Sequence, residues 1–143
     1  MRQEIIAKTE EIINTIAGNW EKSICTLSLI DDQGFPTAST LSTARADGIK
    51  WLSFVTGLAS NKAKRIEKCN KACVCFNSAD YNITLVGTIE VLTDAQAKKD
   101  VWYSGLEHHF TGVDDPNLCV LKFTTNRYQI YGVIGHEEIY GEL

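Results

Sequence analysis

Isoleucine recurs at helical spacing near the start of the chain. Ile5, Ile12, Ile13 and Ile16 fall on one face of a helix, and glutamates occupy the opposite face. This pattern predicts an amphipathic helix that ends at Gly18. Because β-branched isoleucine is not a strong helix former, we expect the helix to depend on packing its apolar stripe against the rest of the protein.

From Ser23 the hydrophobic period becomes two, as in a strand with one buried face. Two glycine-containing turns, at 31–34 and 46–48, separate this strand from further alternating segments at 35–43 and 49–56. Alternating segments joined by such turns are typical of an antiparallel meander. We therefore expect these successive strands to pair with one another.

The remaining segments alternate between helix and strand patterns. Short helices are predicted at 61–69, with Ser60 as N-cap, and from the capping box at 93–96 to about Tyr103. Further strands are expected at 73–76, 81–92, 118–123 and 127–131. The tail from Gly132 has no assignable pattern.

Gly87 interrupts the buried face of the longest predicted strand, 81–92. A glycine at such a position indicates a bulge or a bend. Because a long bent strand lets a small sheet curl into a barrel, the pattern predicts an α+β fold built on a barrel of six to seven mostly antiparallel strands, with short flanking helices. At 143 residues, the chain 1–143 is expected to be a single domain.

Composition narrows the classes of partner. The net charge is −4 and basic residues do not form an extended patch, which argues against nucleic acid as a partner. No stretch has the length and hydrophobicity of a signal peptide or a membrane span. Five cysteines at irregular spacing are best interpreted as reduced thiols. We therefore expect a cytoplasmic protein that does not bind membranes.

Motifs for metals and nucleotides are weak or missing. The chain has no glycine-rich nucleotide loop and no nucleophile elbow. Cys69, Cys73 and Cys75 lack a fourth zinc ligand nearby, so packing is the preferred interpretation and no metal is expected. His108 and His109 belong to an irregular segment for which a polar loop is favoured over a metal site.

Ser60, Asn61 and Lys62 form a more specific candidate. The free N–H groups of a helix N-terminus attract anions, and Lys62 adds a full charge beside them. Thr56, at the end of the preceding strand, can supply a hydroxyl. By itself the pattern is matched more often by an N-cap followed by a solvated lysine.

Four stretches, in this order and spacing, resemble the pyridoxamine 5′-phosphate oxidase-like family of FMN-binding split β-barrels, and within it the bacterial general stress protein branch. They are the hairpin 32–36 leading into 38–42, the strand 51–56 followed by 60–62, the helix 64–70 running into 72–76, and the strand 86–91 followed by a helix carrying Trp102.

The resemblance implies a homodimer with FMN at its interface. The second strand lines the flavin in this family, the end of the third strand contributes, and the Ser-x-Lys step binds the phosphate. Carried onto this chain, the implied cofactor-binding residues are Ser39, Thr40, Leu41, Ser42, Val55, Thr56, Ser60, Asn61, Lys62 and Trp102.

The chain departs from the full oxidases of the family at the phosphate. Their basic residues on and after the second strand match Ser39 and Ala44 here, and the arginine after the serine is Asn61. Arg45 is a candidate replacement for the missing charge. The oxidases also carry C-terminal residues for pyridoxal phosphate, whereas this chain ends in a glutamate-rich segment.

Two functional hypotheses follow from the resemblance. The first is a flavin-dependent oxidoreductase that passes electrons from reduced FMN to a small acceptor, such as a quinone or a nitro compound. Flavin chemistry resides mainly in the ring, so no catalytic side chain is required. The alternative is a non-catalytic protein that stores flavin, senses redox state, or binds haem or a deazaflavin.

Overall fold

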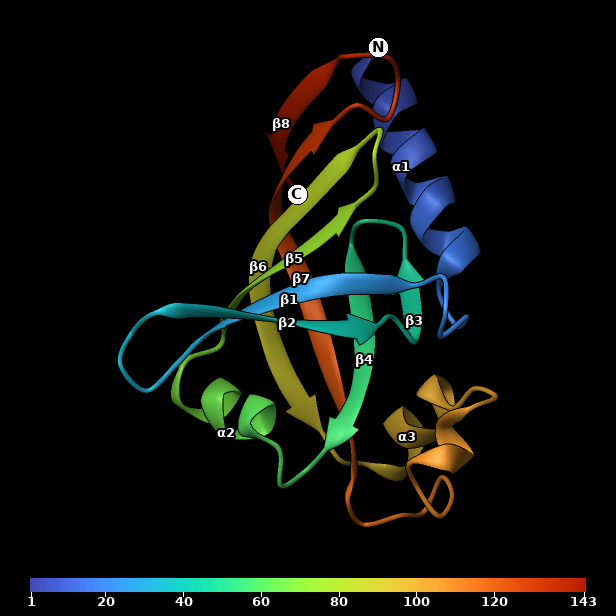
Figure 1. The fold of residues 1–143 in the computed structure, drawn as a ribbon, viewed down its shortest axis with the longest axis vertical. Coiled ribbons are helices and arrows are strands. Elements are labelled where there is room, and N and C mark those ends of the chain that lie inside the picture. Colours follow the sequence, from blue (N-terminus) through green and yellow to red (C-terminus); the bar gives the residue numbers. More distant parts are fainter.

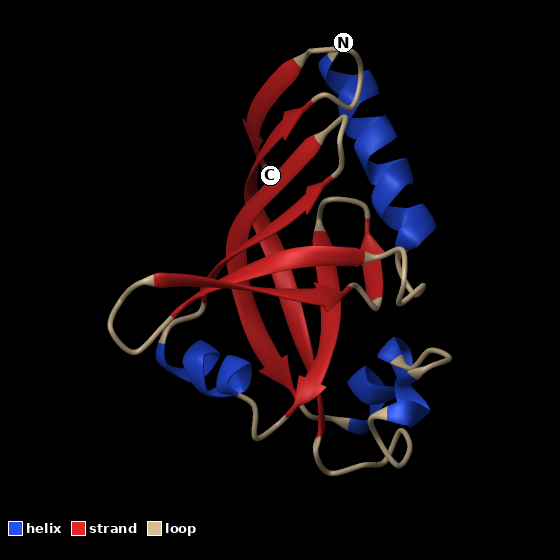
Figure 2. Cartoon of the chain, in the orientation of Figure 1, coloured by secondary structure: helices blue, strands red, loops and turns tan.

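The computed structural model describes residues 1–143 and contains one antiparallel sheet with helices around it (Figures 1 and 2). The helices are α1 (Arg2–Ile16), α2 (Asn61–Lys68) and α3 (Ala95–Val101), with a 3-10 turn at Leu106–His108. The strands are β1 (Ile24–Ile30), β2 (Pro36–Ser42), β3 (Arg45–Asp47), β4 (Trp51–Gly57), β5 (Lys71–Asn77), β6 (Asn82–Leu92), β7 (Leu118–Tyr131) and β8 (Glu138–Glu142).

The two ends of the sheet are neighbours in the chain. The strand order is β2-β1-β5-β6-β7-β4-β3, with β8 added beside β7. Only Thr43 and Ala44 separate β2 from β3, and their N–H groups donate to the carbonyls of Ser23 at 3.0 Å and Ser53 at 2.8 Å. The sheet therefore curls until its edges meet, which confirms the α+β split-barrel fold.

The barrel interior is filled by large apolar side chains from β1, β4, β5, β6 and β7. Phe54, Phe76 and Phe123 are almost completely buried in a cluster of 21 residues. The predicted helix is confirmed as α1, whose residues Ile5 and Ile13 are fully buried in the same cluster. The stripe of isoleucines therefore packs against the barrel core, as its spacing predicts.

The bulge expected at Gly87 is confirmed. The register of β6 against β7 shifts between Val86 and Gly87, where Asn126 is left without a partner between Thr125 and Arg127. The prediction of separate strands at 118–123 and 127–131 was wrong, because the bulge absorbs the irregularity and β7 continues through it. A strand of this length spans the whole barrel.

The meander predicted from the first three strands is only partly correct. β1 and β2 pair as expected, but β2 has no ladder with β4. The hairpin partner of β4 is the short strand β3, which the sequence pattern did not separate from the turn at 46–48. The reason is the closure of the sheet: up to Thr43 the chain is bonded to β1 and the residue before it, and from Ala44 it is bonded to β4.

The tail contributes the last strand. β8 pairs with the end of β7, and Arg2 of α1 donates to the Tyr140 carbonyl at 2.7 Å and to the Tyr128 hydroxyl at 2.9 Å. The start of α1 therefore contacts β8, and the chain ends beside the middle of β7, where the Leu143 N–H donates to the Asn126 carbonyl at 2.9 Å (Figure 1). None of the helices has the length and hydrophobicity needed to cross a membrane.

Candidate functional site

The N-terminus of α2 is joined to the end of β4 by hydroxyl groups. Ser60 is the N-cap, with its Oγ accepting from the Ala63 N–H at 3.4 Å, as predicted. Thr56 Oγ1 donates to the same oxygen at 3.2 Å. Two hydroxyls and the free N–H groups of a helix start therefore occupy one place, an arrangement suited to an anion.

Two cations, Lys62 and Arg65, follow these hydroxyls on α2. Lys62 is half-buried and forms no ion pair, since the ion pairs of the structure are Met1–Glu4 and Lys68–Asp32. Arg65 is three residues further on, which places it next to Lys62 on the helix surface. Its Nη1 donates to Thr37 Oγ1 of β2 at 3.1 Å. Sequence reasoning did not single out Arg65, although its spacing from Lys62 was a usable signal.

The predicted residues on β2 point in two directions. Leu41 packs against the barrel core, whereas Thr40 is exposed on the outer face. Ser39 shares the face of Thr37, the residue that binds Arg65, because side chains alternate along a strand. The Ser42 hydroxyl donates to the Trp20 carbonyl at 2.6 Å and is thereby occupied.

The outer face of β4 is covered by α3. Val55 packs on a small cluster formed by Ala44, Val101 and Val120. Ala44, which the resemblance matches to a basic residue of the full oxidases, is fully buried there. This chain therefore has no space at that position for a solvated cation.

Arg45 holds Trp102 in place and is not a free phosphate ligand. Its guanidinium donates to the carbonyls of Ala44, Asp100 and Trp102 at 2.8, 3.0 and 2.7 Å. The backbone of Trp102 is thereby fixed beside β3. Asn61 lies elsewhere, in the wall of a polar pocket of about 420 Å³ between α2 and the β1–β2 turn. In Figure 1, α2 and α3 flank the end of the barrel at which β4 terminates.

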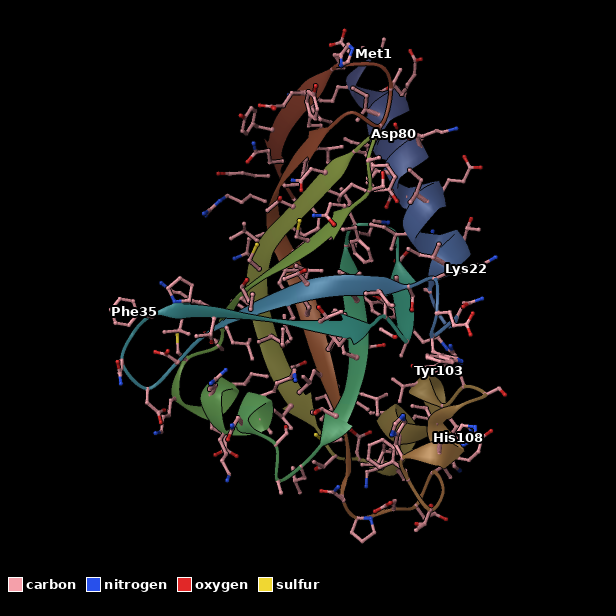
Figure 3. The ribbon with its side chains drawn as sticks, in the orientation of Figure 1. Met1, Lys22, Phe35, Asp80, Tyr103 and His108 are labelled. Carbon is pink, nitrogen blue, oxygen red and sulfur yellow. The ribbon has the colours of Figure 1, made fainter.

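An aromatic pocket of about 400 Å³ adjoins Ser42. Its wall includes Trp20, Tyr103, His108 and His109, and Figure 3 shows Tyr103 and His108 in the same segment after α3. Burial raises the pKa of the Tyr103 hydroxyl, and the nearby Arg45 partly opposes that shift. No group of three or more His, Cys, Asp and Glu side chains is arranged to hold a metal ion.

Comparison with known proteins identifies the family. The family model described as "Pyridoxamine 5'-phosphate oxidase like" matches residues 8–134. The chain belongs to this family. General stress protein 26 of Bacillus subtilis is 31% identical over 72 residues, which span 47% of this chain and 51% of that protein, about half its length.

Solved structures show the same fold. A Clostridium acetobutylicum protein related to general stress protein 26 superposes with a TM-score of 0.84 at 24% identity, covering 100% of this chain and 97% of that one. A pyridoxamine 5'-phosphate oxidase-related, FMN binding protein of Nostoc punctiforme superposes with a TM-score of 0.60 at 15% identity, covering 99% of this chain and 94% of that one. A heme binding protein of Mycobacterium smegmatis superposes with a TM-score of 0.70 at 16% identity, covering 95% of this chain and 57% of that one.

Proposed function

We propose that this chain binds FMN and works as a flavin-dependent oxidoreductase on a small acceptor. The observation that carries the proposal is the joining of Thr56 and Ser60 at the start of α2, with Lys62 beside them and free of ion pairs. A buried phosphate needs a cation and several donors, because leaving it unpaired is costly. Family membership makes a flavin phosphate the favoured anion.

Arg65 completes the phosphate end of the proposed site. It lies one turn from Lys62 and reaches β2 through Thr37, so it provides a second charge between the helix and the strand. This cation offsets the absence of basic side chains at Ser39 and Ala44. The isoalloxazine ring is then expected along the face of β2 that carries Thr37 and Ser39, where its flat apolar surface meets few charged groups. Bound FMN supplies the electron-transfer chemistry, and the chain binds and orients it.

A second copy of the chain is proposed to cover the ring. Trp20, Ile24 and Phe35 are exposed by 56%, 51% and 62%, and they lie on or beside the β1–β2 hairpin. Figure 3 shows Phe35 at the projecting tip of that hairpin. Ile24 and Phe35 lie at opposite ends of the hairpin, so these apolar side chains are spread along it, and we propose that the second copy covers this length. Light scattering at micromolar concentration is expected to give the mass of a homodimer, and a monomer would contradict this part of the proposal.

The experiment that tests the phosphate site compares FMN with riboflavin, which lacks the phosphate. We expect Lys62→Ala to weaken FMN binding roughly tenfold to a hundredfold, as for loss of a charged hydrogen bond, and to leave riboflavin binding unchanged. Lys64→Ala is the matched control, since Lys64 is exposed and, two residues after Lys62, falls on the opposite side of α2. Equal FMN affinity in both variants would place the phosphate elsewhere.

Non-catalytic binding is the second candidate function. The observation that favours it is the burial of Ala44 where the oxidases have a cation, because a weaker grip on phosphate suits a sensor or a carrier. Visible spectra after loading with FMN, haem or a deazaflavin identify the group that is retained. Oxidation of NADH or NADPH with a quinone or a nitro compound then distinguishes the two functions, since only the oxidoreductase turns over repeatedly.

A further inference from the structure

A small cavity lies under α3, outside the proposed flavin site. Its volume is about 120 Å³. Polar groups line it from Arg45, Ser53, Asp100 and Lys122, and the rest of its wall is apolar, formed by Trp51, Leu92, Ala97, Val101 and Val120. We call it the α3 pocket. Pockets for drug-sized ligands measure about 300–1,000 Å³, so this one is too small for an isoalloxazine ring. It has room for a small anion or a few water molecules.

Three neighbouring strands present the polar groups at one level. Ser53 of β4 is the register partner of Arg45 on β3 and of Lys122 on β7. Directly paired residues point to the same face of a sheet, and all three line the α3 pocket. The fold thus places one hydroxyl between two cations in a single row.

The hydroxyl in this row has no partner. Ser53 is 4% exposed, and its Oγ forms no hydrogen bond within the protein. An unsatisfied buried hydroxyl destabilises a fold, so such groups usually have a partner. One other side chain shares this condition, Thr125, which lines none of the described pockets. The orphan hydroxyl beside the α3 pocket therefore leaves a hydrogen-bonding position open to a partner from outside the chain.

The charges around the hydroxyl favour an anion. Neither Arg45 nor Lys122 has a carboxylate partner, and the Lys122 ammonium lies 4.9 Å from the Trp51 ring centre. The three carbonyl bonds of Arg45 leave two of the five guanidinium N–H groups free. Asp100 contributes the one negative charge, and its carboxylate already accepts from Gln96 at 2.8 Å.

We propose that the α3 pocket binds a small tetrahedral oxyanion of the phosphate type, held by the Ser53 hydroxyl and the Lys122 ammonium. Ser53 Oγ has less than 1 Å² of exposed surface. The ligand therefore reaches it when the serine rotamer turns or when the flexible Lys122 side chain moves, both of which are fast motions. Because α3 forms the other wall, the bound anion fastens α3 to β4 and β7.

The test titrates inorganic phosphate at constant ionic strength and follows the backbone amide signals of Ser53 and Lys122 by NMR. Four proteins are compared: the wild type, Ser53→Ala, Lys122→Met and the control Thr125→Val. Thr125→Val removes the other orphan hydroxyl, so it corrects for general effects of losing such a group. Thermal unfolding is measured in parallel, because an anion that binds only the folded state raises Tm.

We expect saturable shifts and a Tm rise of about 3 °C for the wild type and for Thr125→Val. Ser53→Ala and Lys122→Met are expected to bind phosphate at least tenfold more weakly, while remaining folded without phosphate. Glycerol 3-phosphate replaces inorganic phosphate in a second titration: tighter binding identifies the phosphate group of a larger molecule as the ligand, and weaker binding identifies the free ion. Linear, unsaturated shifts, or equal affinity in all four proteins, would overturn the proposal.

Discussion

Gly87 and Thr124 approach each other so closely across the β6–β7 ladder that a Cβ atom at position 87 would lie 1.9 Å from the Thr124 carbonyl oxygen. That oxygen belongs to the backbone of the strand, so it cannot turn away as the end of a side chain can. The bulge beside Gly87 bends both strands at this point. The curvature of the barrel therefore depends on the absence of a side chain there.

Gly87→Ala is expected to destabilise the protein by about 3 kcal/mol or more, because relief of the contact requires a shift of the strand backbone. Urea unfolding followed by circular dichroism measures the change. Gly112→Ala serves as the control, since a Cβ atom there meets nothing within 4 Å. Similar stabilities of the two variants would show that the β6–β7 ladder adjusts without cost.

Arg45 is expected to be more important for stability than for ligand binding at the flavin site. Arg45→Met removes its bonds to the carbonyls of Asp100 and Trp102 and should lower the unfolding free energy by about 2 kcal/mol. Arg45→Lys should recover little of this, because an ammonium group lacks the planar fork of donors. Arg127→Met is the control, with an exposed arginine. Hydrogen exchange at residues 100–102 should accelerate only in the Arg45 variants.

The Cys25 thiol is expected to be inert in the native protein. Burial raises its pKa from 9.0 to about 12. Alkylation at pH 8, mapped by mass spectrometry, should therefore modify Cys25 only after unfolding, and half-buried Cys69 earlier. The unfolded state loses this proton near pH 9, before the folded state does, so the contribution of Cys25 to stability falls between pH 9 and 12. Cys25→Ala should remove that part of the pH dependence.

Asp115 is expected to hold the loop before β7 in a pH-dependent way. Its carboxylate accepts from the N–H groups of Thr111 and Asn117, both at 2.9 Å, and these bonds lower its pKa below 3.8. The stabilisation is therefore complete above pH 3.8 and is lost as the pH falls through the lower folded value. The amide signals of Thr111 and Asn117 should shift together in that acid range. The shift should be missing in Asp115→Asn and retained in Asp114→Asn.

Local patterns were sufficient for several elements of this fold. The isoleucine stripe of α1, the N-cap at Ser60 and the bulge at Gly87 each depend on residues within a few positions of one another. Periodicity and backbone preference act at that range, so they can be interpreted without knowledge of the partner strand. The helix start next to Thr56 was predictable for the same reason.

Contacts between distant segments left no comparable pattern in the amino-acid sequence. Closure of the barrel at Thr43 and Ala44 exchanges one partner strand for another, and nothing near these residues marks the exchange. The bond from Arg45 to the Trp102 carbonyl joins residues 57 positions apart. The orphan hydroxyl of Ser53 exists only because β3, β7 and α3 surround it. Pairing, burial and unmet hydrogen bonds are properties of the folded arrangement, since each depends on which remote residues pack together.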